Sequence, residues 1–132
     1  MIPIHSLDHL VLTVADIDAS VAFYTRVLGM REVVFAGGRR ALAFGDQKIN
    51  LHQHHAEFEP KAIRPTPGSA DICLLTGMPN DEILIHLRDC GVPVVEGPVE
   101  RTGATGPLIS IYVRDPDGNL VEIARPVETT GS

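Results

Sequence analysis

Apolar and polar side chains alternate over residues 7–14, as they do along a β-strand with two different faces. One face holds Asp8, Leu10, Leu12 and Val14, and the other holds Leu7, His9, Val11 and Thr13. Asp16 then stands where a helix N-cap is expected, and apolar residues recur at helical spacing until Gly29. This pattern predicts a strand followed by a helix.

Three shorter runs after Gly29 have the composition of strands. They span residues 31–35, 40–44 and 48–53, and the pairs Gly37-Gly38 and Gly45-Asp46 separate them. Residues 54–68 carry several prolines and show little periodicity, so we predict that they connect the two halves. A role as a lid is an alternative.

The same order recurs in the second half of the chain. A shift of 62 positions brings residues 8–12 onto residues 70–74 and Leu28-Gly29 onto Cys90-Gly91. We expect a strand over 69–75, a helix capped by Asn80 or Asp81, and strands at 94–95, 108–113 and 119–124. The segment 115–118, Asp-Pro-Asp-Gly, predicts a tight hairpin between the last two strands. The repeat predicts two stacked modules.

Composition and charge narrow the function classes. The 132 residues suit one domain, and a formal net charge of −6 argues against a protein that holds nucleic-acid phosphates. No apolar run reaches the roughly 20 residues of a membrane helix, and residues 1–5 lack the features of a signal peptide. We therefore expect a cytoplasmic protein without nucleic-acid or membrane partners, whose two cysteines, Cys73 and Cys90, are reduced.

Polar side chains with metal-binding chemistry lie on the strand faces that point away from the predicted helices. They are His9 on the first strand, Asn50 and His52 on the fourth, Asp71 on the fifth and Glu122 on the last. If two curved sheets face each other, two imidazoles and one carboxylate converge and leave coordination positions open. The alternative is that each is an ordinary half-buried histidine or solvated carboxylate.

Three segments carry a family resemblance: residues 7–12 (LDHLVL), 23–30 (FYTRVLGM) and 115–123 (DPDGNLVEI). They resemble the vicinal oxygen chelate superfamily, which holds glyoxalase I, fosfomycin-resistance enzymes, extradiol dioxygenases and bleomycin-binding proteins. Residues 48–52 and 65–71 further resemble the branch called glyoxalase domain-containing protein 5, with its virulence-associated bacterial relatives. The resemblance spans essentially the whole chain.

The resemblance implies an α+β fold in which two tandem βαβββ modules form a curved, cup-shaped mixed sheet with helices outside. A single domain covers residues 1–132, with module one at about 5–53, the connector at 54–68, module two at about 69–125 and a tail at 126–132. It also implies a divalent metal ion (nickel, zinc, manganese or iron(II)) in the cup.

His9 and Glu122 fall on the family's first and last ligand positions. Asn50 departs from the carboxylate of glyoxalase I, and Asp71 stands where the family's enzymes place a histidine or a glutamate-like ligand. His52 is the natural replacement for the missing ligand, with Asp71 as a fourth or alternative ligand or as a general base. The expected metal ligands are thus His9, His52 and Glu122, and classical glyoxalase I activity is not expected.

The expected function is that of a metal-dependent lyase, isomerase or transferase acting on a small molecule with adjacent oxygens. The alternatives are an iron(II) extradiol dioxygenase and a metal-free binding protein that sequesters a small ligand. We expect a homodimer. Arg39, Arg40, Lys61 and Arg64 either meet an anionic substrate or are simply solvated, and His54 and His55 are weaker ligand candidates.

Overall fold

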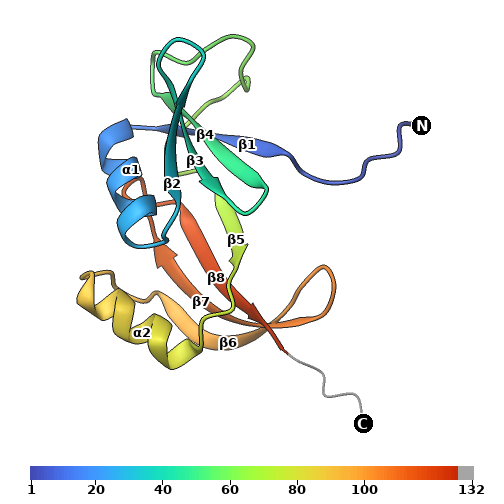
Figure 1. Ribbon diagram of the computed structural model, residues 1–132, viewed down its shortest axis with the longest axis vertical. Coiled ribbons are helices and arrows are strands. Elements are labelled where there is room, and N and C mark those ends of the chain that lie inside the picture. The colour runs from blue at the N-terminus through green and yellow to red at the C-terminus, as the bar shows by residue number, and fades with distance from the viewer. Residues whose placement is uncertain (128–132) are drawn as a thin grey trace. The chain divides into compact units, whose positions relative to one another are not determined.

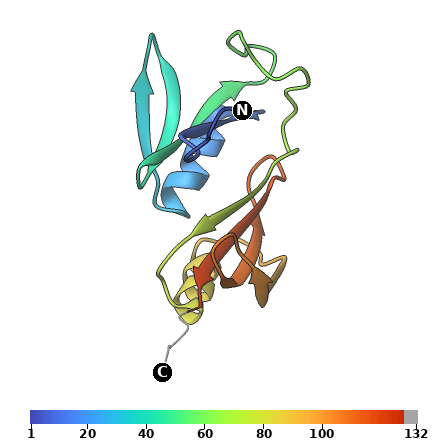
Figure 2. The ribbon, with the colours of Figure 1, turned by 90° about the vertical axis from the view of Figure 1, so that its right-hand side faces the viewer.

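A computed structural model describes residues 1–127 of the chain (Figures 1 and 2). The chain divides into two compact units, Met1–Gly68 and Ser69–Ser132. We call them unit 1 and unit 2 and describe each by itself.

Unit 1 consists of a four-stranded mixed sheet and one helix. Its elements are β1 (His9–Val14), α1 (Ile17–Arg26), β2 (Arg31–Phe35), β3 (Arg39–Phe44) and β4 (Gln47–Gln53). The strand order is β1-β4-β3-β2, with β1 parallel to β4 and the other pairs antiparallel. The apolar row of β1 joins a buried core with α1, β3 and β4, whose members include Leu12, Val14, Val21, Tyr24, Leu42, Ile49 and Leu51.

Helix α1 begins where the sequence predicts, after Asp16, and its last helical residue is Arg26, earlier than the predicted stop at Gly29. Asp16 is the N-cap, and its Oδ1 accepts hydrogen bonds from the backbone N–H groups of Asp18 (2.9 Å) and Ala19 (3.3 Å). Gly29 has a φ of +66°, the left-handed conformation that ends many helices. The start of the helix is therefore fixed by a side-chain cap, and its end is followed by a glycine in the left-handed conformation.

Unit 2 repeats this arrangement. Its elements are β5 (Asp71–Leu75), α2 (Asn80–Asp89), β6 (Glu96–Thr102), β7 (Pro107–Arg114) and β8 (Leu120–Pro126). The order β5-β8-β7-β6 matches that of unit 1, and β5 is again parallel to its neighbour β8. Gly91, with a φ of +71°, takes the place of Gly29. Two tandem modules in an α+β fold are thus confirmed.

Several predicted limits in unit 2 were wrong. Pro79, which offers no side-chain cap, is the N-cap of α2, so Asn80 is the first helical residue and neither it nor Asp81 caps the helix. The strand expected at 94–95 is β6 instead, which contains Gly97 and Pro98 and has a bulge between Glu96 and Val99. A sheet edge tolerates such residues because one side of the strand needs no partner.

The ends of other strands also differ from the expectation. β1 begins two residues later than residue 7, and β5 begins two residues later than residue 69. Pro126, which was expected to open the tail, belongs to β8, and residues 128–132 of that tail lie outside the described residues. No helix among residues 1–127 is long and apolar enough to cross a membrane.

A buried aspartate organises the predicted hairpin between β7 and β8. Asp115 is 5% exposed, and its Oδ1 accepts hydrogen bonds from the backbone N–H groups of Asp117 and Asn119, both at 2.9 Å. Its Oδ2 accepts a third hydrogen bond, of 2.8 Å, from the Asn119 side chain. Asn119 Oδ1 in turn accepts one from the Ala70 backbone, which ties the turn to the chain just before β5.

Candidate functional site

The face of the unit 1 sheet that lies opposite α1 carries the predicted site residues of this unit. Arg40, on the other face, contacts Asp18 of α1 at 3.1 Å, which shows which face the helix covers. The strand register places twelve residues on what we call the helix-free face: His9, Val11, Thr13, Arg31, Val33, Phe35, Arg39, Ala41, Ala43, Lys48, Asn50 and His52.

His9 has the surroundings of a metal-ligating histidine. Its Nδ1 lies 2.7 Å from Asp8 Oδ2, and its side chain is 42% exposed. When Nδ1 donates its proton to that carboxylate, Nε2 carries the free lone pair. Histidine ligands are commonly oriented by a carboxylate in this way, so His9 fits a divalent ion.

His52 lies beside a cavity of about 260 Å³ that is closed on one side by the connector, residues 54–68. The cavity is lined by Val11, Thr13, His52, Pro60, Lys61, Ala62 and Pro65. The ring of Phe58 stands edge-on to the His52 ring at 5.6 Å between centroids, and the Arg39 guanidinium lies 4.1 Å from the centre of the Phe58 ring.

These neighbours set the protonation of His52. Burial lowers the pKa of its imidazole below the ordinary 6.5, the positive charges of Arg39 and Lys61 lower it further, and Glu57 opposes them. His52 is therefore neutral at neutral pH, the form that accepts a hydrogen bond or binds a metal ion.

His9 and His52 share the helix-free face but not the same end of it. His9 pairs with Lys48 and His52 with Thr13, so four residue steps, about 13 Å, separate them along the strands. A metal ion needs nitrogen ligands at about 2.1 Å. The sheet by itself therefore does not bring the two imidazoles together.

Asn50 occupies an intermediate position. It pairs with Val11, two steps beyond His9, and its Oδ1 is buried without a hydrogen-bond partner among residues 1–127. In unit 2, Glu122 pairs with Cys73, two steps beyond Asp71. The repeat thus makes His9 the counterpart of Asp71, and Asn50 the counterpart of Glu122.

Glu122 is held by its neighbours on β7 and β5. The fully buried Ser110 hydroxyl donates a 2.5 Å hydrogen bond to Oε2, and the Cys73 thiol forms a further hydrogen bond with this carboxylate. Burial and the charges of Glu122 and Asp71 raise the pKa of the Cys73 thiol to about 11. Cys73 is therefore protonated at neutral pH and is not an activated nucleophile. Asp71 is exposed at the start of β5.

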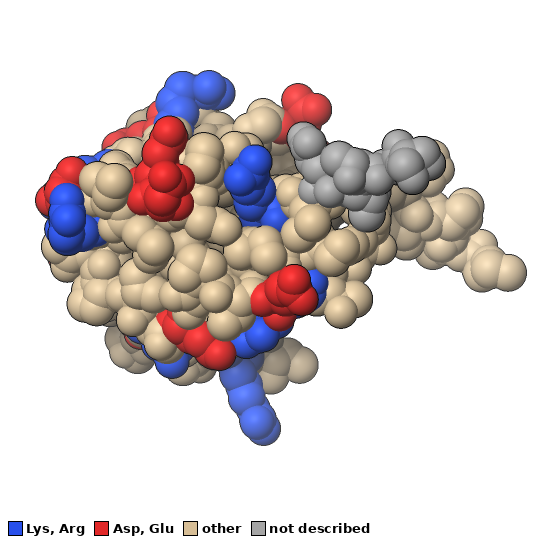
Figure 3. Space-filling model, turned by 90° about the horizontal axis from the view of Figure 1, so that it is seen from below, with Lys and Arg blue, Asp and Glu red and all other residues tan. Residues whose placement is uncertain are grey.

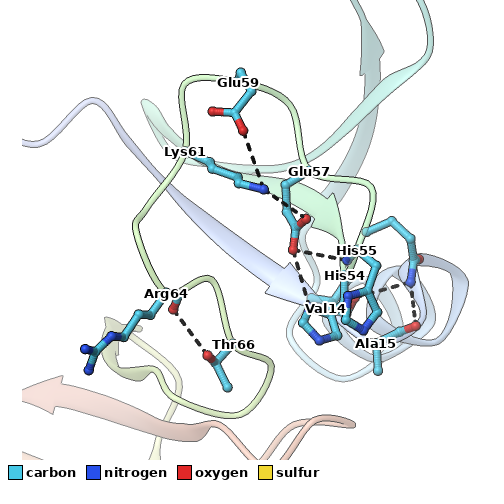
Figure 4. Close-up of polar contacts among 10 residues, drawn as sticks. Val14, Ala15, His54, His55, Glu57, Glu59, Lys61, Arg64 and Thr66 are labelled. Carbon is cyan, nitrogen blue, oxygen red and sulfur yellow. Dashed lines mark hydrogen bonds and ion pairs between the residues drawn. The ribbon is translucent and has the colours of Figure 1, made fainter.

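The connector is tied together by Glu57, a residue that sequence reasoning did not single out (Figure 4). Its side chain is only 4% exposed and contacts the His54 ring (3.3 Å), the His55 backbone N–H (3.1 Å) and the Lys61 ammonium (3.7 Å). Hydrogen bonds from backbone N–H groups lower the pKa of its carboxyl. The His54 and His55 rings pack against each other with 3.7 Å between their centroids, so both side chains take part in contacts within the connector.

The predicted metal ligands are divided between the units, with His9 and His52 in unit 1 and Glu122 in unit 2. Neither unit alone, over residues 1–127, gathers three or more His, Cys, Asp or Glu side chains into a group that could hold a metal ion. The common site of His9, His52 and Glu122, with Asp71 beside it, stays a prediction.

Comparisons with known proteins extend these findings. Residues 6–123 match the family model described as the Glyoxalase/Bleomycin resistance protein/Dioxygenase superfamily. Virulence protein STM3117 of Salmonella typhimurium is 58% identical over 94% of this chain and 86% of its own length. Its crystal structure has a TM-score of 0.94, with 96% of this chain and 100% of that chain covered.

Two further proteins, a glyoxalase domain-containing protein and a lyase, are similar to this chain. Glyoxalase domain-containing protein RDO1 of Mycosarcoma maydis is 57% identical over 92% of this chain and 68% of its own length. The crystal structure of lactoylglutathione lyase from Agrobacterium tumefaciens has a TM-score of 0.71 at 25% identity, with 93% of this chain and 95% of that chain covered.

Proposed function

Because the chain belongs to the Glyoxalase/Bleomycin resistance protein/Dioxygenase superfamily, we propose that it is a metal-dependent enzyme acting on a small molecule with adjacent oxygens. The observation that carries the proposal is the pairing of His9 with Asp8 at 2.7 Å, which leaves Nε2 available for a metal ion. The hydrogen bond from Ser110 to Glu122 orients a carboxylate in a comparable way in the other unit.

His9 and Glu122 are the two ends of the proposed ligand set. His52 and Asp71 compete for the third position, and the four-step separation of His9 from His52 favours Asp71. His52 then faces the substrate as a neutral hydrogen-bond acceptor beside the cavity. If His52 is a ligand after all, the exposed Asp71 is free to act as the general base that moves a substrate proton.

A divalent ion bound by these residues supplies Lewis-acid polarisation of a substrate oxygen. The chain itself orients the ligands through Asp8 and Ser110 and keeps His52 unprotonated. Val11, Thr13 and the connector form the walls of a cavity of about 260 Å³, which suits a small substrate. A homodimer, common among small proteins, is part of the proposal.

Metal analysis by mass spectrometry tests the proposal on protein purified without an affinity tag. We expect about one ion per chain in the wild type and its loss in His9→Ala and Glu122→Gln. Asp71→Asn and His52→Ala distinguish the two candidates for the third ligand, and Arg88→Gln, on the exposed side of α2, is the matched control. Iron(II) as the bound ion would favour ring-cleaving dioxygenase chemistry.

The opposite result is equally clear. A wild type without metal, and without a thermal shift on adding nickel, zinc, manganese or iron(II), would overturn the proposal. The same protein would then be assayed as a metal-free binding protein.

A further inference from the structure

The charge on the helix-free face of unit 1 is opposite to the charge of the chain as a whole. The chain has a net charge of −6, yet none of the twelve residues on this face is acidic, and three are Arg31, Arg39 and Lys48. On the face seen in Figure 3, by contrast, residues of both signs are mixed. Arg39 lies at the His52 end of the sheet, whereas Arg31 and Lys48 lie in the row of His9, about 13 Å away along the strands. Of the three, Arg39 is therefore the cation next to the cavity, where its charge raises the local concentration of anionic ligands.

These three cations have no acidic partners within the described part of the chain. Among residues 1–127, no carboxylate lies within ion-pair distance of Arg31, Arg39 or Lys48. Arg39 and Lys48 are instead held over the rings of Phe58 and Phe35, at 4.1 Å and 4.0 Å from the ring centres. A cation on an aromatic face keeps its charge and its N–H donors available for another partner.

The connector adds a fourth cation near His52. Lys61 lines the cavity, and its ammonium lies 3.5 Å from Glu59 and 3.7 Å from Glu57 (Figure 4). Both distances exceed the usual N–H···O hydrogen-bond length of about 2.7–3.2 Å. The two carboxylates hold the ammonium by ion pairs that offset part of its charge, and neither forms a short hydrogen bond with it, so its N–H donors are available to a ligand.

We infer that the cavity beside His52 takes a small organic anion, whose charged end is received by Lys61 of the connector and Arg39 of β3. The inference names a substrate class, and it rests on the proposed function in taking this cavity as the place where the substrate binds. It gives Arg39 and Lys61 the role of specificity-determining residues.

A hydroxyl group on the same ligand has a matching acceptor. Asn50 stands beside Val11, which lines the cavity, and its buried Oδ1 has no donor among the described residues. A buried acceptor without a donor costs free energy, which a ligand hydroxyl recovers once the Asn50 side chain turns toward the cavity, of whose lining Asn50 is not part. A 2-hydroxy carboxylate combines the anionic group with this donor, and it also carries two adjacent oxygens.

NMR titration of the full chain, stripped of metal with a chelator, tests the inference. The probes are lactate and its neutral amide, lactamide, at equal ionic strength, followed through the chemical shifts of His52 and Lys61. Without metal, chelation by the carboxylate contributes nothing, so failure of the proposed metal site does not affect the result. We expect lactate to bind about tenfold more tightly than lactamide, the worth of one charge-assisted contact.

Variants identify the groups responsible. Arg39→Gln and Lys61→Gln are each expected to remove most of the preference for lactate, and Arg88→Gln to leave it unchanged, with unaltered backbone spectra as the check on folding. Equal affinity for the acid and the amide, no lactate-dependent shift at His52, or a preference that survives both variants would overturn the inference.

Discussion

Burial and a few neighbouring groups determine the protonation of Cys73 and His52, and a neighbouring hydroxyl orients Glu122. A serine hydroxyl orients Glu122, and Glu122 in turn helps to keep the Cys73 thiol protonated. His52 is neutral because it is partly buried and has two cations nearby. At this scale, exchanging a neighbour is expected to change the chemistry while the fold stays intact.

The titration of His52 is the most direct check of this view. In metal-free protein we expect its imidazole to titrate below 6.5, and Arg39→Gln to move its pKa upward because a nearby positive charge is removed. The folded protein then binds fewer protons at His52 than the unfolded chain. This contribution to stability is complete above about pH 6.5 and declines as the pH falls from there towards the folded pKa.

NMR titration of the imidazole carbon-bound protons measures both quantities. Arg88→Gln is the control and should leave the titration of His52 where it is. A His52 pKa at or above 6.5 in the wild type would contradict the prediction.

Asp115 offers a test of stability at a single residue. Asp115→Ala removes the acceptor of three hydrogen bonds in the β7–β8 turn and leaves the buried amide of Asn119 without its partner. We expect a loss of about 2–4 kcal/mol, measured by urea denaturation. Asp89→Ala, on the exposed end of α2, should change stability by less than about 0.5 kcal/mol. Equal effects of the two variants would show that the turn network is not stabilising.

The two helices differ in how their first turns are satisfied. α1 has a side-chain cap in Asp16, whereas the N-cap of α2 is Pro79, which has none. Replacing Asp16 by alanine is therefore expected to cost about 1 kcal/mol, and replacing it by serine, which keeps an oxygen acceptor, much less. Chemical denaturation of both variants gives the comparison. If the serine variant is as unstable as the alanine variant, the cap is not the cause.

The connector is expected to depend on Glu57 for its order. Glu57→Gln removes the charge that holds Lys61 and weakens the hydrogen bonds to His54 and His55. We predict severalfold faster limited proteolysis within residues 54–68 at neutral pH, with Glu100→Gln, at an exposed position of β6, as the control. The wild-type connector should loosen on acidification, because a carboxyl with a lowered pKa loses its stabilising contribution as pH falls through that pKa.

Most of the elements could be predicted from periodicity because their apolar residues alternate or recur at helical spacing. β2 was placed correctly at residues 31–35, and α1 was placed between its cap and Gly29. β6 was misplaced because its sequence, with Gly97 and Pro98, lacks the apolar alternation of a central strand. β6 is a strand because it pairs with β7 in the folded sheet, and this pairing is not visible in the pattern of apolar residues along β6 itself.

At the scale of the whole molecule, the sequence predicts only part of the candidate site, because the residues of that site are divided between two units. The alternation of residues correctly put His9, Asn50 and His52 on one face of a sheet. It could not give the four-step distance between His9 and His52, which depends on the register of β1 against β4. Ser110 and Phe58 were missed for a related reason, since only the fold brings them to Glu122 and His52.

Because the proposed ligands are divided between the two units, a mixing experiment can test whether one metal site takes its ligands from a single chain or from two chains. We predict that equal amounts of His9→Ala and Glu122→Gln protein, unfolded and refolded together, bind about a quarter of the wild-type metal if each site combines unit 1 of one chain with unit 2 of another. Half of the dimers then contain both variants, and each of those has one intact pair of units. A site built within one chain gives no recovery, and metal analysis of the refolded mixture distinguishes the two outcomes.

The contacts of Glu57 have a consequence for the thermodynamics of binding. The wall that the connector gives to the cavity is already fixed by ion pairs and hydrogen bonds within the same unit. A loop that is ordered beforehand loses little conformational entropy when a ligand arrives, so more of the contact energy is expressed as affinity. Calorimetry on a ligand of this cavity is therefore expected to show a smaller entropic penalty in the wild type than in Glu57→Gln.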